Sequence, residues 1–148
     1  MAIQDTIDAA DAVVVLLNAA TLPESITFER TFIPEFDPRD MGADPVGVVV
    51  PASIDINIAS RVTDSEDNII EIGLGRVVAN FNAAVVSHLE TVEAIKREIR
   101  GQDNQSLTMP GDGGTVQFTG VEVVLFVPEL VQQSIALSVV RVTYRGFA

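Results

Sequence analysis

Apolar residues recur every three or four positions in two parts of the chain, which is the spacing of a helix with one buried face. In residues 3–18 the repeated apolar positions are Ile3, Ile7, Ala10, Val14 and Leu17. In residues 80–100 they are Val85, Leu89, Val92, Ile95 and Ile99. The pattern predicts two helices, and the second begins at Asn80 or Asn82 and ends before Gly101.

Elsewhere the apolar residues alternate with polar ones or form short runs bounded by Gly and Pro, as they do in strands. The expected strands span residues 26–33, 46–50, 53–63, 69–79, 115–127 and 130–145. Pro51 separates the second strand from the third, and a polar turn at residues 64–68 separates the third from the fourth. In the last strand the apolar positions change from odd to even numbers, so we expect a bulge near Val139–Val140. Residues 34–45 and 101–114 are expected to be loops.

This order, α-β-β-β-β-α-β-β, with strands grouped in hairpins, is typical of the α+β class. We therefore expect a mostly antiparallel sheet that contains a long hairpin and packs both helices on one face. A length of 148 residues fits one domain over residues 1–148. A chain of this size can bury about 70% of its unfolded surface and so build a core without disulfides.

The chain is strongly acidic, with 21 Asp and Glu against 9 Lys and Arg and a net charge of −12. Nucleic-acid binding depends on neutralising phosphates, so this balance argues against a DNA-binding regulator. It is compatible with a passive channel, whose repulsive wall would let DNA slide without sticking. The mean hydropathy of +0.33 indicates either apolar surface that is buried between subunits or a sheet core rich in Val and Ile.

No apolar run approaches the roughly 18–20 residues of a membrane span. The apolar stretch at residues 12–17 follows Asp5, Asp8 and Asp11, whereas a signal peptide carries positive charge at that place. We therefore expect a mature cytosolic protein without a membrane partner.

The side chains that most often carry chemistry at neutral pH are scarce, because the chain has no Cys and a single His, His88. His88 lies beside Leu89 in the second helix, and without a Cys or a second His it has no set of metal ligands, so we interpret it as a boundary residue of that helix. A Ser–His–Asp triad would have to use His88, and no Ser occupies a G-x-S-x-G turn. We expect no catalytic residue, no cofactor and no metal.

Three polar residues that follow the third strand resemble the first half of a calcium loop in their spacing. They are Asp64, Glu66 and Asn68. The resemblance stops there, because Ile69 and Gly75 stand where such a loop needs a Gly and a bidentate Glu. We therefore interpret residues 64–68 as an acidic hairpin turn.

A second acidic cluster lies in the loop at residues 34–45 and consists of Asp37, Asp40 and Asp44. Paired carboxylates can cleave glycosidic bonds, but sugar sites usually also contain aromatic platforms, and aromatic residues make up only 5% of this chain. We expect salt bridges or loop capping from this cluster. The Arg residues on expected strands suit ion pairs either between subunits or within one. They are Arg61, Arg76, Arg141 and Arg145.

Three stretches, taken in their order along the chain, resemble the small tail-terminator and tail-completion proteins of tailed bacteriophages. The first is residues 28–41, with its strand, aromatic residues, prolines and acidic loop. The second is Ser60-Arg61, followed by a polar turn and residues 69–73. The third is residues 126–130 followed by the closing strand at 138–145. The resemblance spans most of residues 1–148 and departs from the family at 102–109, where a more aromatic segment is expected.

The resemblance implies a homo-oligomeric ring, usually of six subunits, that caps the tail tube at full length and stops its elongation. The implied partners are further copies of the chain, the tail tube protein and the head–tail connector or stopper protein, with DNA only passing through the channel. The family has no catalytic residues. The implied location is the tail or neck of the virion, with the host cytoplasm as the place of assembly.

We therefore expect a structural virion protein that joins the tail to the head connector. The residues expected at the subunit or tube interface are Arg30, Asp37, Arg39, Asp40, Arg61, Asp64, Glu66 and Arg76. One alternative is a head–tail connector, stopper or neck protein. The other, from a different class, is a small acidic enzyme or ligand-binding domain that uses Asp37, Asp40 and His88.

Overall fold

Six strands and two helices make up the part of the chain that the computed structural model describes. That part comprises residues 2–24, 26–31, 45–58, 64–77, 81–101, 106–108, 115–124 and 135–147. The elements are, in order, α1 (Ala2–Ala19), β1 (Phe28–Arg30), β2 (Val46–Ile58), β3 (Asp64–Val77), α2 (Phe81–Arg100), β4 (Ser106–Thr108), β5 (Thr115–Val124) and β6 (Ile135–Phe147).

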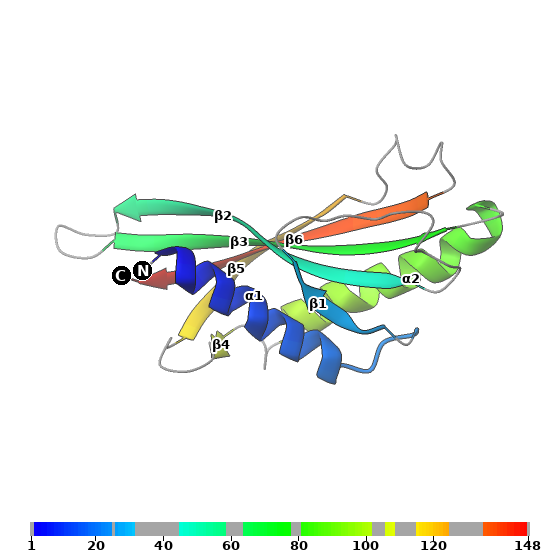
Figure 1. Ribbon diagram of the computed structural model, residues 1–148, viewed down its shortest axis with the longest axis horizontal. Coiled ribbons are helices and arrows are strands. Elements are labelled where there is room, and N and C mark those ends of the chain that lie inside the picture. The colour runs from blue at the N-terminus through cyan, green and yellow to red at the C-terminus, as the bar shows by residue number, and fades with distance from the viewer. Residues whose placement is uncertain are drawn as a thin grey trace.

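The strands form one sheet in the order β1-β2-β3-β6-β5-β4 (Figure 1). Every neighbouring pair is antiparallel except β1 and β2, which are parallel. The central pair, β3 and β6, keeps one register from Ser65 opposite Phe147 to Val77 opposite Ile135. The chain therefore folds around two long central strands, with β2 on one side of them and β5 on the other.

Both helices cover the same face of the sheet, as predicted, and Figure 1 shows them together beneath it. One continuous core joins that face to the helices. From the central strands it includes Ile70, Ile72, Leu74, Val140, Val142 and Tyr144, and from the helices Ala9, Ala10, Val13, Leu17, Val92, Ile95 and Ile99. The core residues of β3 and β6 all have even numbers because side chains alternate between the faces of a strand. The fold is α+β, with a mostly antiparallel sheet and a long β2–β3 hairpin.

The predicted element order is wrong in two places, because the observed order is α-β-β-β-α-β-β-β. Residues 46–50 and 53–63 were expected to be separate strands, but Val46–Ile58 is one strand that passes through Pro51. The register with β3 shifts between Pro51 and Ser53, and this irregularity accommodates the Pro without ending the strand. The segment expected to be a loop at 101–114 contains the short strand β4.

The acidic turn predicted at residues 64–68 is also wrong, since β3 begins at Asp64. Pairing with β6 overrides the local turn tendency: Asn68 lies opposite Tyr144, and its Nδ2 donates to the Tyr144 carbonyl at 3.3 Å. No bulge lies at Val139–Val140, because both residues keep the regular register with β3. The apolar residues of β6 simply occupy both faces, and the register shift lies in β5 between Phe118 and Gly120.

The short strand β1 is held between α1 and the edge of β2. The Asn18 side chain at the end of α1 accepts a hydrogen bond from the Phe28 amide at 2.8 Å and donates to the Phe28 carbonyl at 3.1 Å. Arg30 Nε donates to Asp11 of α1 at 2.5 Å. Among the described residues, no helix is long and apolar enough to cross a membrane.

The buried Phe28 ring packs directly against the backbone of Gly47 in β2. A Cβ at residue 47 would lie 2.5 Å from Cδ1 and Cε1 of Phe28 and 2.9 Å from Cγ2 of Ile26. Such distances force the ring to move, and a displaced ring leaves its packed position against β2. At Gly120 the same added atom would meet nothing within 4 Å.

We expect Gly47→Ala to lower the free energy of unfolding by about 1–3 kcal/mol, because it overpacks the Phe28 site. The matched control is Gly120→Ala, which adds the same methyl group to a strand with open space around it. Urea denaturation followed by circular dichroism measures both. Equal stability of the two variants would contradict this packing.

Candidate functional site

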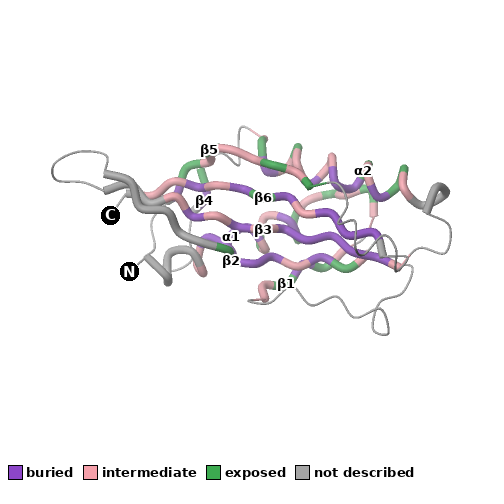
Figure 2. Tube along the Cα trace, turned by 90° about the horizontal axis from the view of Figure 1, so that it is seen from above, coloured by how far each residue is buried: buried purple, intermediate pink, exposed green. Residues whose placement is uncertain are grey.

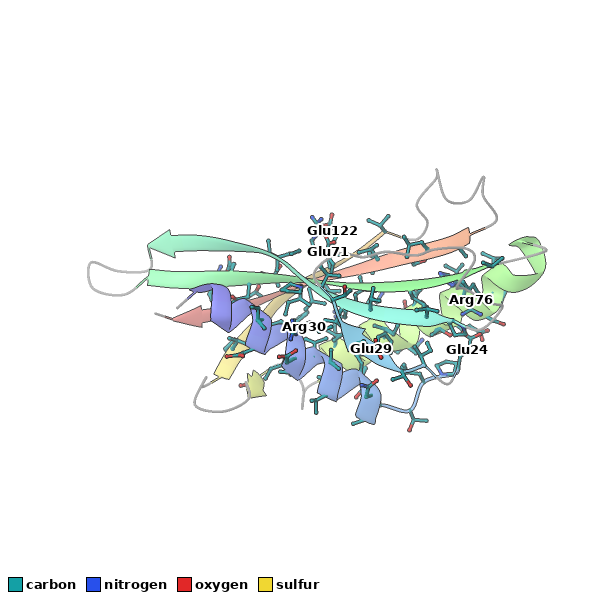
Figure 3. The ribbon with its side chains drawn as sticks, viewed as in Figure 1. Glu24, Glu29, Arg30, Glu71, Arg76 and Glu122 are labelled. Atoms are coloured by element: carbon teal, nitrogen blue, oxygen red, sulfur yellow. The ribbon has the colours of Figure 1, made fainter. Side chains whose placement is uncertain are left out.

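A buried polar cluster connects the segment after α1 to the end of β3 and to α2. Arg76 of β3 is 5% exposed. Its guanidinium forms a two-point contact with Glu24, in which Nη1 donates to Oε1 at 2.8 Å and Nη2 donates to Oε2. Thr91 Oγ1 of α2 lies 3.1 Å from Glu24 Oε2. Figure 3 shows Glu24 and Arg76 close together beside α2. The ion pair therefore joins three segments that are distant in sequence.

His88 and Ser138 form a second buried polar contact between α2 and β6. The distance from His88 Nε2 to Ser138 Oγ is 2.7 Å, and the two residues are 0% and 1% exposed. The interpretation of His88 as a boundary residue of the helix is therefore wrong. The pKa of His88 is lowered to about 4, mainly by burial and also by the positive charge of Arg76, while Glu24 opposes the shift. The imidazole is neutral at pH 7.

The electrostatics of the Glu24 carboxyl follow from the same contact. The hydrogen bond from Arg76 holds the pKa of Glu24 below its usual value, against the opposing effect of burial. Glu24 is therefore a carboxylate and Arg76 a cation at neutral pH, and the cluster carries one compensated pair of charges. Removing one partner of this largely buried pair would destabilise the fold, because the remaining charge would lose its counter-charge without being fully hydrated.

A Ser hydroxyl close to a neutral imidazole is the arrangement of a nucleophile and its general base in hydrolases. Such a pair acts only when a substrate carbonyl can reach the hydroxyl. Ser138 lies on the helix-covered face of β6, and neither residue exposes more than 1% of its surface. The groove found on α2 is lined by neither of them. We interpret the contact as a hydrogen bond that fixes α2 on the sheet.

The opposite face of the sheet carries rows of paired charges instead of helices. Arg141 of β6 donates to Glu71 of β3 at 2.7 Å, and its Nη1 lies 3.9 Å from Glu122 of β5. Arg145 donates to Asp67 through Nε at 2.8 Å. Figure 3 shows Glu71 and Glu122 on the side of the sheet away from the helices. Cross-strand register places each Arg directly opposite its carboxylates, so these charges compensate one another within the protomer.

An open groove of about 670 Å³ runs along α2 beside β5. Its apolar lining includes Pro23, Val86, Leu89, Val92, Ala94 and Val123. Val86 is 59% exposed, so this part of the groove places apolar surface in contact with water. Charged residues of α2, among them Glu93 and Arg97, border the groove. This lining fits an apolar polypeptide segment better than a charged small molecule.

Both edges of the sheet end in strands of three residues. Strand β1 pairs only with residues 47–49 of β2, and β4 pairs only with residues 115–117 of β5. Within the described part of the chain, no strand pairs with the outer side of residues 50–58 in β2 or of residues 118–124 in β5. Figure 2 shows β2 and β5 on opposite sides of the central strands. As far as the described residues go, the sheet therefore has two open edge segments that face away from each other.

Of the residues predicted at the subunit or tube interface, those that the structure describes do not lie together in one site. Arg30 is bonded to Asp11, and Arg76 is buried against Glu24, so Arg76 does not lie on the surface where it was predicted. Asp64 and Glu66 lie in β3, but their side chains are outside the described part. The remaining candidates, Asp37, Arg39, Asp40 and Arg61, lie outside the described residues altogether.

Sequence reasoning missed Glu24, Thr91 and Ser138 as members of the buried clusters. A signal was present for the strand residues: Arg76 has the parity of Ile72 and Leu74, and Ser138 has the parity of Val140 and Val142. No signal of that kind exists for Glu24, which lies in an irregular segment.

Comparison of the chain with protein-family models and with curated protein sequences found no match to either. Among the residues that the structure describes, no group of three or more His, Asp or Glu is placed to hold a metal ion. The functional inference therefore depends on the two open strand edges, the α2 groove and the resemblance in the sequence.

We expect Arg76→Met to lower the free energy of unfolding by about 2 kcal/mol, because it leaves the partly buried Glu24 carboxylate without its cation. The matched control is Arg141→Met on the exposed face, where the loss should stay below about 1 kcal/mol. Adding Glu24→Leu to Arg76→Met should restore part of the stability by removing the unpaired charge. Equal losses for the two Arg variants in urea denaturation would contradict the role given to this pair.

Proposed function

We propose that this chain is a structural virion protein, a tail terminator whose copies join head to tail in a closed ring on the end of a phage tail tube. The observation that carries the proposal is the pair of open strand edges on opposite sides of one sheet. Two different surfaces that recognise each other make a heterologous contact, and repetition of that contact produces a ring when the rotation closes.

The chemistry of the edges supports assembly through them. A strand edge presents unpaired amide and carbonyl groups, and natural proteins block it with charges, prolines or a covering element unless it serves for pairing. Residues 121–124 of β5 are Val-Glu-Val-Val, with one charge and no Pro. Val124 is 49% exposed. Such a segment would promote aggregation of a free monomer, whereas in a subunit it can pair with a neighbouring copy.

The charge of the chain supports a passive role toward DNA. A net charge of −12 per copy would give a ring with a strongly negative surface, which repels phosphates and keeps DNA from adhering as it passes. The Arg side chains of the exposed sheet face are already paired with Glu71, Glu122 and Asp67. They are therefore poor phosphate ligands.

The two alternatives make different demands on the protein. An enzyme that used His88 together with Asp37 and Asp40 would need an accessible imidazole, and His88 is 0% exposed. A head–tail connector or stopper would use the same kind of ring but bind the head vertex instead of the tube. The binding partner therefore separates the connector from the terminator.

We expect the purified protein, alone or with tail tubes, to form rings of about six copies with an open centre. Light scattering gives the mass and negative-stain images give the shape. Rings seated on tube ends, with tubes that no longer elongate, support the terminator. Rings that bind only tail-free heads favour the connector. A protein that stays monomeric at high concentration, with tubes and with heads, contradicts both.

A further inference from the structure

We propose that neighbouring copies are joined by strand pairing: residues 50–58 of β2 in one copy lie along residues 118–124 of β5 in the next, above the groove on α2. The inference rests on the proposed function in one respect, since it takes the neighbour to be a second copy of this chain. The product is a sheet that continues from subunit to subunit.

The accepting side combines an open edge with an apolar floor. The β5 residues on the helix-covered face include Val121 and Val123, which lie opposite Val142 and Val140 of β6. Val123 also lines the groove, together with Val86 and Leu89 of α2. Figure 2 shows α2 along the β5 side of the sheet. A strand added about 4.8 Å beyond β5 would place every second side chain over this floor.

The donating side has the pattern that such a floor requires. The sequence of β2 after Pro51 alternates Ile54, Ile56 and Ile58 with Asp55 and Asn57. In strand addition the main-chain hydrogen bonds provide affinity, and pockets for alternate side chains provide specificity. The alternation offers one apolar row for such pockets and one polar row. The donor and acceptor segments are about 30 Å and 24 Å long at roughly 3.4 Å per residue, so they match over most of their length.

A second copy is the occupant that accounts for both edges at once. Every copy carries one donor and one acceptor, and they lie on opposite sides of the same sheet. Head-to-tail pairing provides partners for the backbone groups of both edges, apart from Pro51, which has no N–H, and it covers the groove. A two-fold β2–β2 contact would leave the β5 edge and the exposed Val86 in water. A foreign strand on β5 would leave β2 open.

The absence of Cys from the chain makes a direct test possible. One set of variants carries a single Cys on the donor edge, at the exposed Ala52. The other set carries a single Cys on the acceptor edge, at Thr119, Glu122 or Val124, which are also exposed. Strands β2 and β5 are three strand spacings apart within a protomer, about 14 Å, and a disulfide needs Cα atoms within about 7 Å. A donor–acceptor link must therefore join two copies.

The assembled protein is treated with an oxidant or a short bis-maleimide. We expect a mixture of Ala52→Cys with at least one acceptor variant to give cross-linked dimers that contain one of each, while each variant alone gives at least tenfold less. Val86→Glu in the groove should reduce the cross-linked fraction about tenfold. The matched control is Val15→Glu on α1, which introduces the same charge at a Val that is 70% exposed and should leave cross-linking unchanged.

The outcomes separate this joint from the ring itself. Rings without a donor–acceptor link at any of the three positions, or with links only between identical positions, overturn the joint and leave the terminator proposal standing. Equal cross-linking in the Val86→Glu and Val15→Glu variants overturns the role of the groove. A chain that stays monomeric even on tail tubes overturns the ring, and the joint with it.

Discussion

The antiparallel pairing of β3 with β6 is the contact on which the other features of this protein depend. Its single register divides the side chains of both strands into two sets. The even-numbered set faces the helices and forms the core, and the odd-numbered set carries the charge pairs of the exposed face. The same pairing leaves β2 and β5 as flanking strands. The three-residue strand β1 covers only part of β2, and the three-residue strand β4 covers only part of β5. Among the described residues, the open edges thus follow from the strand order and from the shortness of β1 and β4.

Polar residues within the helix-covered face determine how α2 is placed on the sheet. Hydrophobic side chains alone allow a helix to slide, because apolar contact is not directional. The Thr91–Glu24 and His88–Ser138 hydrogen bonds are directional, and each ties a residue of α2 to a fixed partner. A one-residue slip of β3 or β6 would move Arg76 or Ser138 to the exposed face and break its contact with Glu24 or His88. The groove that lies between α2 and β5 therefore has a fixed shape.

Periodicity alone was sufficient to predict both helices, the α+β class and the helix-covered face. It failed where pairing with a distant strand decides the local structure. Residues 64–68 have the composition of a turn, yet Asp67 and Asn68 are held in β3 by contacts with Arg145 and Tyr144 of β6. The partner of His88 lies 50 residues away and leaves no trace in the sequence around the helix. The open edges were also invisible, because they depend on which strands pair and over what length.

Hydrogen exchange of backbone amides, compared between the assembled and the dissociated protein, tests the central claim that the open edges join the subunits. Amides in a strand ladder exchange slowly, whereas amides on an open edge exchange fast. The account predicts that residues 118–124 and 50–58 gain protection on assembly, while the central strand β6 is protected in both states. Assembly that leaves both edge segments as exposed as in the monomer would contradict it.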